Sequence, residues 1–124
     1  MLQNILALKG MYLIGSSTLK LNRIINDYDF IYLGELKDLL NILNDIDYEI
    51  SNFITFHYEG FDYEISYGQQ NTIVFELLGI SESIFLEKYN HKIGTEFTLF
   101  YKSIFKRDKD LKDIETHRII TMML

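Results

Sequence analysis

The chain lacks several features that would point to particular classes of protein. It contains no cysteine, which excludes disulfide bonds and thiolate metal sites and fits a cytoplasmic location. No apolar run approaches the ~20 residues needed to cross a bilayer. The first residues carry no basic segment of the kind that opens a secretory signal peptide. We therefore expect a cytoplasmic protein that makes no membrane contact.

Proline is also absent, the chain has a single alanine, and its nine lysines outnumber its three arginines. This composition is typical of an AT-rich genome and suggests a phage or a low-GC bacterium as the source. Basic charge is scarce, since the net charge is −6, and this disfavours binding along a long nucleic-acid backbone. With 48% hydrophobic and 24% charged residues, we expect one soluble domain over 1–124, with a core over 1–80 and a helical tail over 81–124.

Common enzyme motifs are missing as well. The sequence has no P-loop, no dinucleotide-binding glycine fingerprint, no His-Glu-x-x-His and no Gly-x-Ser-x-Gly. The charged cluster 108–110 lacks the glycine and the spaced ligands of a calcium-binding loop. The histidines show no metal-binding spacing, and we assign them no role; they are His57, His91 and His117.

Hydrophobic periodicity predicts alternating helices and strands. Helices are expected over 2–9, 18–25, 35–45, 82–89, 95–106 and 109–122. Strands are expected over 11–15, 28–33, 51–58 and 61–67, the last two joined by a hairpin turn at Glu59-Gly60. Residues 72–78 fit a strand and a helix equally well. This order predicts an α/β protein of the α+β kind, with a mixed sheet, flanking helices and a helical C-terminal tail.

Two short segments suggest a site for a metal ion and a phosphate. Gly15, Ser16 and Ser17 end a predicted strand before a predicted helix, where backbone N–H groups and hydroxyls can bind a phosphate. Asp27 and Asp29 stand at i and i+2 on the next strand, so their carboxylates share one face. Metal and phosphate would then be neighbours.

This stretch resembles the signature of the DNA polymerase β-like nucleotidyltransferase superfamily. In that signature an apolar residue, Gly and Gly or Ser precede, by a limited gap, Asp-apolar-Asp or Glu-apolar; here Ile14-Gly15-Ser16 precedes Asp27-Tyr28-Asp29-Phe30. The family also uses a third carboxylate on a later strand. Asp62 and Glu64 both alternate with apolar residues over 61–67, and either one completes the triad.

The resemblance implies a minimal nucleotidyltransferase fold and an activity. A nucleoside monophosphate would move from a triphosphate onto a hydroxyl acceptor, with Mg²⁺ or Mn²⁺ held by Asp27, Asp29 and Asp62, or by Glu64 in place of Asp62. The third carboxylate would also take the proton of the acceptor. Gly15, Ser16 and Ser17 would approach the triphosphate. Net charge favours a small molecule or a protein side chain over a long nucleic acid as acceptor.

Basic residues near the signature have two interpretations. Lys20 and Arg23, three residues apart in the predicted helix 18–25, either neutralise phosphate charge or are ordinary surface cations, and the second is the more common case. The tail segments Leu99–Lys102, Lys106-Arg107 and Lys112–Ile114 are similar to tails of phage-encoded family members, although Ser103 replaces the histidine that often follows the lysine. Lys102 would then contact a triphosphate or a base, but we expect it to be a surface cation.

An alternative function is a catalytically inactive phage protein of this fold, which binds or inhibits a host protein or binds a nucleotide. Exposed aromatic residues would suit a homodimer or a partner protein, and minimal members of the family often act with a second chain.

Overall fold

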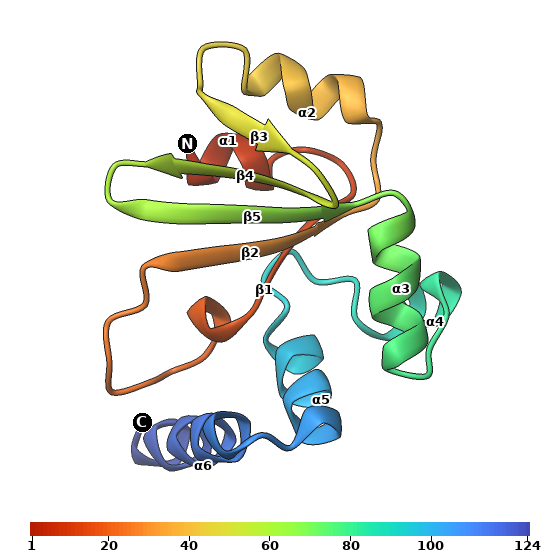
Figure 1. Cartoon of the computed structure of the whole chain (residues 1–124). Coiled ribbons are helices and arrows are strands. Elements are labelled where there is room, and N and C mark those ends of the chain that lie inside the picture. The colour runs from red at the N-terminus through yellow and green to blue at the C-terminus, as the bar shows by residue number, and fades with distance from the viewer.

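The computed structural model describes residues 1–124 and places them around one five-stranded mixed sheet (Figure 1). Its strands are β1 (Met11–Ile14), β2 (Asp27–Tyr32), β3 (Tyr48–Ile50), β4 (Phe53–Tyr58) and β5 (Phe61–Tyr67). The order across the sheet is β1-β2-β5-β4-β3, and β2 and β5 are the one parallel pair. The centre of the sheet therefore joins two strands that are distant in sequence.

Six α-helices and one short 3₁₀ helix surround the sheet. They are α1 (Leu2–Leu6), η1 (Ser16–Thr18), α2 (Leu36–Ile42), α3 (Gln69–Leu77), α4 (Glu82–Lys88), α5 (Thr95–Phe105) and α6 (Asp108–Met123). None of these helices combines the length and the apolar character that crossing a membrane requires. The predicted α+β class, the mixed sheet with flanking helices and the helical C-terminal tail are confirmed.

The two faces of the sheet carry separate apolar cores. On the first face, side chains of all three inner strands pack with Ile5 of α1 and with Leu39 of α2. On the second face, Ile31 of β2 packs with Phe75 of α3 and with Phe97 of α5, among others. Figure 1 shows α1 and α2 on one side of the sheet and α3, α4 and α5 on the other. The sheet is thus the middle of three layers.

Strand alternation decides which residues of β2 and β5 reach each face. Phe30 and Tyr63 belong to the first core, so Asp29 and Glu64 point to the second face. The apolar core of that face gathers around β1 and β2 and does not cover the start of β5, where Asp62 and Glu64 are exposed. The second face is consequently apolar toward α3 and α5 and acidic where β2 and β5 begin.

The predicted helix over 18–25 is wrong. Only η1 forms there, and Leu19 is already extended (φ −102°, ψ 156°). A tertiary hydrogen bond takes a backbone group that a helix would need, because the Thr95 hydroxyl of α5 donates to the Thr18 carbonyl (2.9 Å); the Thr18 hydroxyl donates within its own turn to the Gly15 carbonyl (2.8 Å). Ile24 is 87% exposed, so a short helix here would bury too little apolar surface to form.

Other predicted bounds need smaller corrections. The helices expected over 2–9 and 35–45 end early, at Leu6 and Ile42, and the expected strand 51–58 is β4 with β3 as an unforeseen partner. Residues 72–78, which fitted either state, lie mostly in α3. Asn71 explains this choice, because its amide donates to the Tyr32 carbonyl (2.7 Å) and accepts from the Ser66 hydroxyl, which anchors the helix under the sheet.

Candidate functional site

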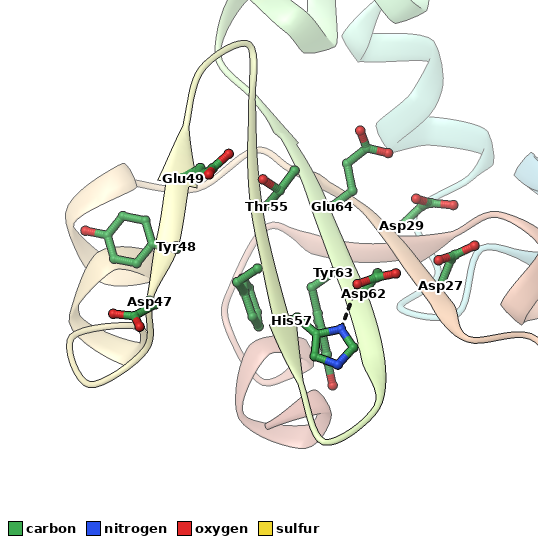
Figure 2. Close-up of a pocket in the computed structure, with 11 residues that line it drawn as sticks. Asp27, Asp29, Asp47, Tyr48, Glu49, Thr55, His57, Asp62, Tyr63 and Glu64 are labelled. Carbon is green, nitrogen blue, oxygen red and sulfur yellow. Dashed lines mark hydrogen bonds and ion pairs between the residues drawn. The ribbon is translucent and has the colours of Figure 1, made fainter.

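Four carboxylates meet where the parallel strands β2 and β5 begin. In the register of this pair Asp27 lies opposite Asp62, and Asp29 lies opposite Glu64. All four side chains belong to the second face, because they alternate with residues of the first core. Figure 2 shows them side by side along the two strands. The sheet therefore brings together all the acids that the sequence proposed.

These carboxylates line an open depression of about 810 Å³. Two further acids line this depression: Asp47, the residue before β3, and Glu49 of β3 (Figure 2). The other lining residues are Tyr48, Thr55, Phe56, His57 and Tyr63. We call this cavity the acidic depression. Its lining suits a cation or a ligand that carries positive charge.

Among the carboxyl groups of the site, that of Asp29 has the most strongly shifted pKa. Its pKa is raised to about 7, first because the side chain is buried, and then by the charge of Glu64, hydrogen bonding with Glu64 and the charge of Asp27. The ammonium of Lys102 acts in the opposite direction. Crowded carboxylates with a raised pKa favour the binding of a proton or a metal cation between them.

Asp62 makes a different contact. Its Oδ1 lies 2.7 Å from His57 Nδ1 on the neighbouring strand β4, and its side chain is 69% exposed. Glu64, rather than Asp62, is the register partner of Asp29. Of the two acids that the sequence offered as third carboxylate, Glu64 therefore lies opposite Asp29, and Asp62 lies opposite Asp27 and against His57.

Gly15 connects β1 to the site. It has a φ of +90°, and a Cβ atom at this residue would lie 2.6 Å from Oδ2 of Asp29. The Gly15 N–H donates to the hydroxyl of Thr98 on α5 (2.9 Å). A residue without a side chain is thus needed where the chain passes over the Asp29 carboxylate.

A second depression of about 410 Å³ lies on the other side of Asp27 and Asp29. It is lined by Ser16, Arg23, Ile24, Ile25, Asn26, Asp27, Asp29, Tyr101, Lys102, Arg107, Lys109 and Asp113. We call it the basic depression, because four of these residues are cationic. Burial, followed by the charge of Asp29, raises the pKa of the Tyr101 phenol, which therefore stays neutral. The two aspartates of β2 form the wall that both depressions share.

The expectation that Lys102 is a surface cation is wrong. Its side chain is 4% exposed, and Nζ lies 3.4 Å from Asp110 Oδ1 and 3.1 Å from Asp113 Oδ2. Both aspartates come from α6, which packs against α5. A lysine in an amphipathic helix is buried here because α6 supplies the carboxylates that compensate its charge.

The remaining predicted residues are divided between the site and its surroundings. Arg23 forms an ion pair with Asp113 (2.9 Å), and Ser16 lines the basic depression. The Ser17 hydroxyl is buried without a hydrogen-bond partner and lines neither depression. The side chain of Lys20 lines neither depression, while its backbone N–H donates to His117 Nδ1 (2.8 Å).

Sequence reasoning gave no site role to Arg107, Asp110 and Asp113, of which Arg107 and Asp113 line the basic depression. Asp110 and Asp113 stand at i and i+3, so they share one helix face, and Arg107 donates to Asp110 Oδ2 from Nε (2.6 Å). Burial alone would raise the pKa of Asp110, but hydrogen bonds from Arg107 and Lys102 outweigh it and lower that pKa. The i, i+3 acids beside a basic segment were the available signal.

The carboxylates suit a divalent cation by the chemistry of their oxygens, but their side chains are not grouped closely around one point. Hard carboxylate oxygens select Mg²⁺ or Mn²⁺, and the pKa of Asp29 is raised first by burial and then by the negative charge of Glu64 and Asp27. No group of three or more His, Cys, Asp or Glu side chains is arranged closely enough to hold a metal ion.

Comparison of the chain with protein-family models, with curated proteins and with solved structures finds no match in any of the three.

Proposed function

We propose that this protein is a metal-dependent nucleotidyltransferase that moves a nucleoside monophosphate from a nucleoside triphosphate onto a hydroxyl acceptor. One observation carries the proposal: Asp27 and Asp29 separate an acidic depression from a basic one, and Ser16 lines the basic side. Such a wall has cation-binding oxygens on it and phosphate-binding groups next to it. Both are needed to bring a triphosphate and an acceptor together.

Asp27, Asp29 and Glu64 would hold Mg²⁺ or Mn²⁺. A bound ion stabilises the negative charge that develops on the transferred phosphoryl group and on the leaving pyrophosphate. The basic depression supplies the complementary groups, because Arg107 and Lys109 face the same space as Ser16. Guanidinium, ammonium and hydroxyl donors together match the oxygens of a triphosphate.

The proposed transfer needs a proton acceptor as well as charge stabilisation. The acceptor oxygen forms a bond to the α-phosphorus while the bond from that phosphorus to pyrophosphate breaks. The hydroxyl proton of the acceptor passes to a carboxylate oxygen of Glu64, which is exposed on the acidic side next to Asp29. Pyrophosphate leaves on the basic side.

The shape and charge of the acidic depression favour a compact acceptor. Its wall carries Asp47 and Glu49 in addition to the acids of β2 and β5, and these charges repel a nucleic-acid backbone. A small molecule or a protein side chain with a free hydroxyl therefore suits this side better than a long RNA or DNA.

A two-part experiment tests the proposal. Thermal melting with each nucleoside triphosphate, with and without Mg²⁺ or Mn²⁺, would compare the wild type with Asp29→Asn. Asp45→Asn serves as the matched control, because Asp45 is exposed and lines neither depression. We expect a metal-dependent rise in melting temperature for the wild type and for Asp45→Asn, and none for Asp29→Asn; at 100 times Kd the gain is about 2.7 kcal/mol.

The second part measures transfer directly. Incubation with a triphosphate labelled at the α-phosphate and a panel of hydroxyl acceptors should release pyrophosphate and label one acceptor class, and Asp29→Asn should do neither. Stabilisation without any transfer, or no stabilisation at all, would contradict the proposal. It would favour the alternative, an inactive module that binds a nucleotide or a host protein.

A further inference from the structure

The carboxylate of Asp113 gathers donors from three separate segments of the chain. Ser16 Oγ of η1 donates to Oδ2 at 3.4 Å, Arg23 Nη2 of the loop 19–26 donates to the same oxygen at 2.9 Å, and Lys102 Nζ of α5 donates to it at 3.1 Å. Arg23 also reaches Oδ1 at 3.2 Å. One hydroxyl, one guanidinium and one ammonium therefore converge on a single anionic group.

Such a set of donors matches a phosphoryl group as well as it matches a carboxylate. Phosphate oxygens accept charge-assisted hydrogen bonds from arginine and lysine, and a serine hydroxyl adds a neutral donor. The same residues, Ser16, Arg23 and Lys102, line the basic depression together with Asp113. The donors are thus within reach of a ligand in that depression.

Asp110 provides an internal comparison. It also contacts Lys102 (3.4 Å), and it receives two hydrogen bonds from the Arg107 side chain, but it is fully buried and does not line the basic depression. The network therefore contains one carboxylate that is enclosed by protein and one, Asp113, that faces the cavity. Only the second can exchange places with a ligand.

Arg23, Lys102 and Arg107 share the two carboxylates Asp110 and Asp113, so each carboxylate has more than one cationic partner. If Asp113 turned away, two of these cations and the Ser16 hydroxyl would lose their shared partner. A phosphoryl group is the ligand chemistry that would replace it with the least loss of hydrogen bonds.

We propose that the Asp113 carboxylate occupies a phosphoryl-binding position and has to be displaced before a phosphorylated ligand binds there. This inference rests on the proposed function for the identity of the ligand, the di- or triphosphate part of a nucleotide. Asp113 then acts as an internal competitor, and the apparent affinity equals the intrinsic affinity multiplied by the fraction of molecules in which the position is free. The same contact ties the loop 19–26 to α6 while the ligand is absent.

The test uses pyrophosphate as the probe, without metal and in the presence of EDTA, at constant ionic strength. Isothermal titration would compare the wild type with Asp113→Asn and with the matched control Asp110→Asn. We expect Asp113→Asn to bind pyrophosphate at least tenfold more tightly than the wild type, and Asp110→Asn to show no gain. Adding Arg23→Gln to Asp113→Asn should remove the gain. Equal binding by the wild type and Asp113→Asn, or an equal gain in both single variants, would overturn the inference.

A rescue experiment covers loss of stability in the variants. Asp113→Ala removes the carboxylate altogether, and pyrophosphate should raise its melting temperature more than that of the wild type or of Asp110→Ala, whose missing carboxylate a ligand in the cavity cannot replace. If pyrophosphate stabilises Asp113→Ala no more than Asp110→Ala, the inference is wrong.

The two proposals fail in different ways. The pyrophosphate measurements contain no metal and no acceptor, so they do not depend on transfer by Asp29 or Glu64. A gain in Asp113→Asn together with no transfer by the wild type would leave the phosphoryl position standing and reject the transferase. Transfer by the wild type, together with no tighter pyrophosphate binding in Asp113→Asn, would support the transferase and reject the phosphoryl position.

Discussion

Gly15 lies so close to the carboxylate of Asp29 that a Cβ atom at residue 15 would be 2.6 Å from Oδ2. The contact links the end of β1 to the centre of the site. It explains, from packing alone, why a glycine precedes the serines: the backbone has a φ of +90°, and no side chain fits in front of the carboxylate.

Gly15→Ala should therefore cost more stability than a glycine replacement at another positive φ. Gly60→Ala is the matched control, because Gly60 has a φ of +86° but open space around its missing Cβ. We expect about 1 kcal/mol for Gly60→Ala from the backbone conformation and about 3 kcal/mol for Gly15→Ala, where displacement of Asp29 is added. Urea unfolding measures both, and equal costs would show that Asp29 moves aside freely.

The raised pKa of Asp29 predicts that stability depends on pH in an unusual direction. Between pH 4 and about 7 the folded protein binds more protons at Asp29 than the unfolded chain does, so the contribution of this group to stability falls as pH rises through that window. Asp29→Asn removes the effect. At pH 8 it should be more stable than the metal-free wild type by about 4 kcal/mol, and near pH 4 the two should be equal.

Asp45→Asn is again the control, and its difference from the wild type should not change with pH, because Asp45 is exposed and does not line the acidic depression. Denaturant titrations at pH 4, 6 and 8 decide the question. An Asp29→Asn protein that is no more stable than the wild type at pH 8 would mean that the carboxylates do not destabilise the fold.

Glu64 and Asp62 can be distinguished by matched amide variants. Glu64 neighbours Asp29 in the strand register, whereas Asp62 pairs with His57 at 2.7 Å. We expect Glu64→Gln to abolish the stabilisation by Mg²⁺ and a triphosphate, a loss of about 2.7 kcal/mol at 100 times Kd, and Asp62→Asn to retain most of it. The opposite pattern in a thermal shift assay would assign the third carboxylate to Asp62.

Two lysines of the basic depression should behave differently when they are replaced. Lys102→Met leaves the buried carboxylates of Asp110 and Asp113 with one partner fewer, so we expect a loss of about 3–5 kcal/mol in unfolding free energy. Lys109 is exposed and lines the same depression. Lys109→Met should change stability by less than about 0.5 kcal/mol but weaken triphosphate binding.

Chemical denaturation and nucleotide titration of both lysine variants provide the measurements. Similar stabilities for Lys102→Met and Lys109→Met would mean that the buried ion pairs contribute nothing beyond what their desolvation costs, and unchanged nucleotide binding by Lys109→Met would remove that lysine from the site.

Local patterns in the sequence determined much of the sheet and of the acidic face. Alternation over 61–67 and the apolar run after Asp27 defined β5 and β2, and the spacing of Asp27 and Asp29 alone required their carboxylates to share a face. The alternation that puts Asp62 and Glu64 on one face of β5 depends on the same period of two, which tertiary contacts do not alter.

Tertiary structure decided what local patterns left open. The helix expected over 18–25 did not form, because Thr18 is hydrogen-bonded within its own turn and to α5, and Ile24 of this segment stays exposed. Parallel pairing of β2 with β5 placed Glu64 beside Asp29, and packing of α6 on α5 buried Lys102. Each of these outcomes depends on groups that are far apart in the sequence. A period of two or of 3.6 carries information about neighbours along the chain and none about such partners.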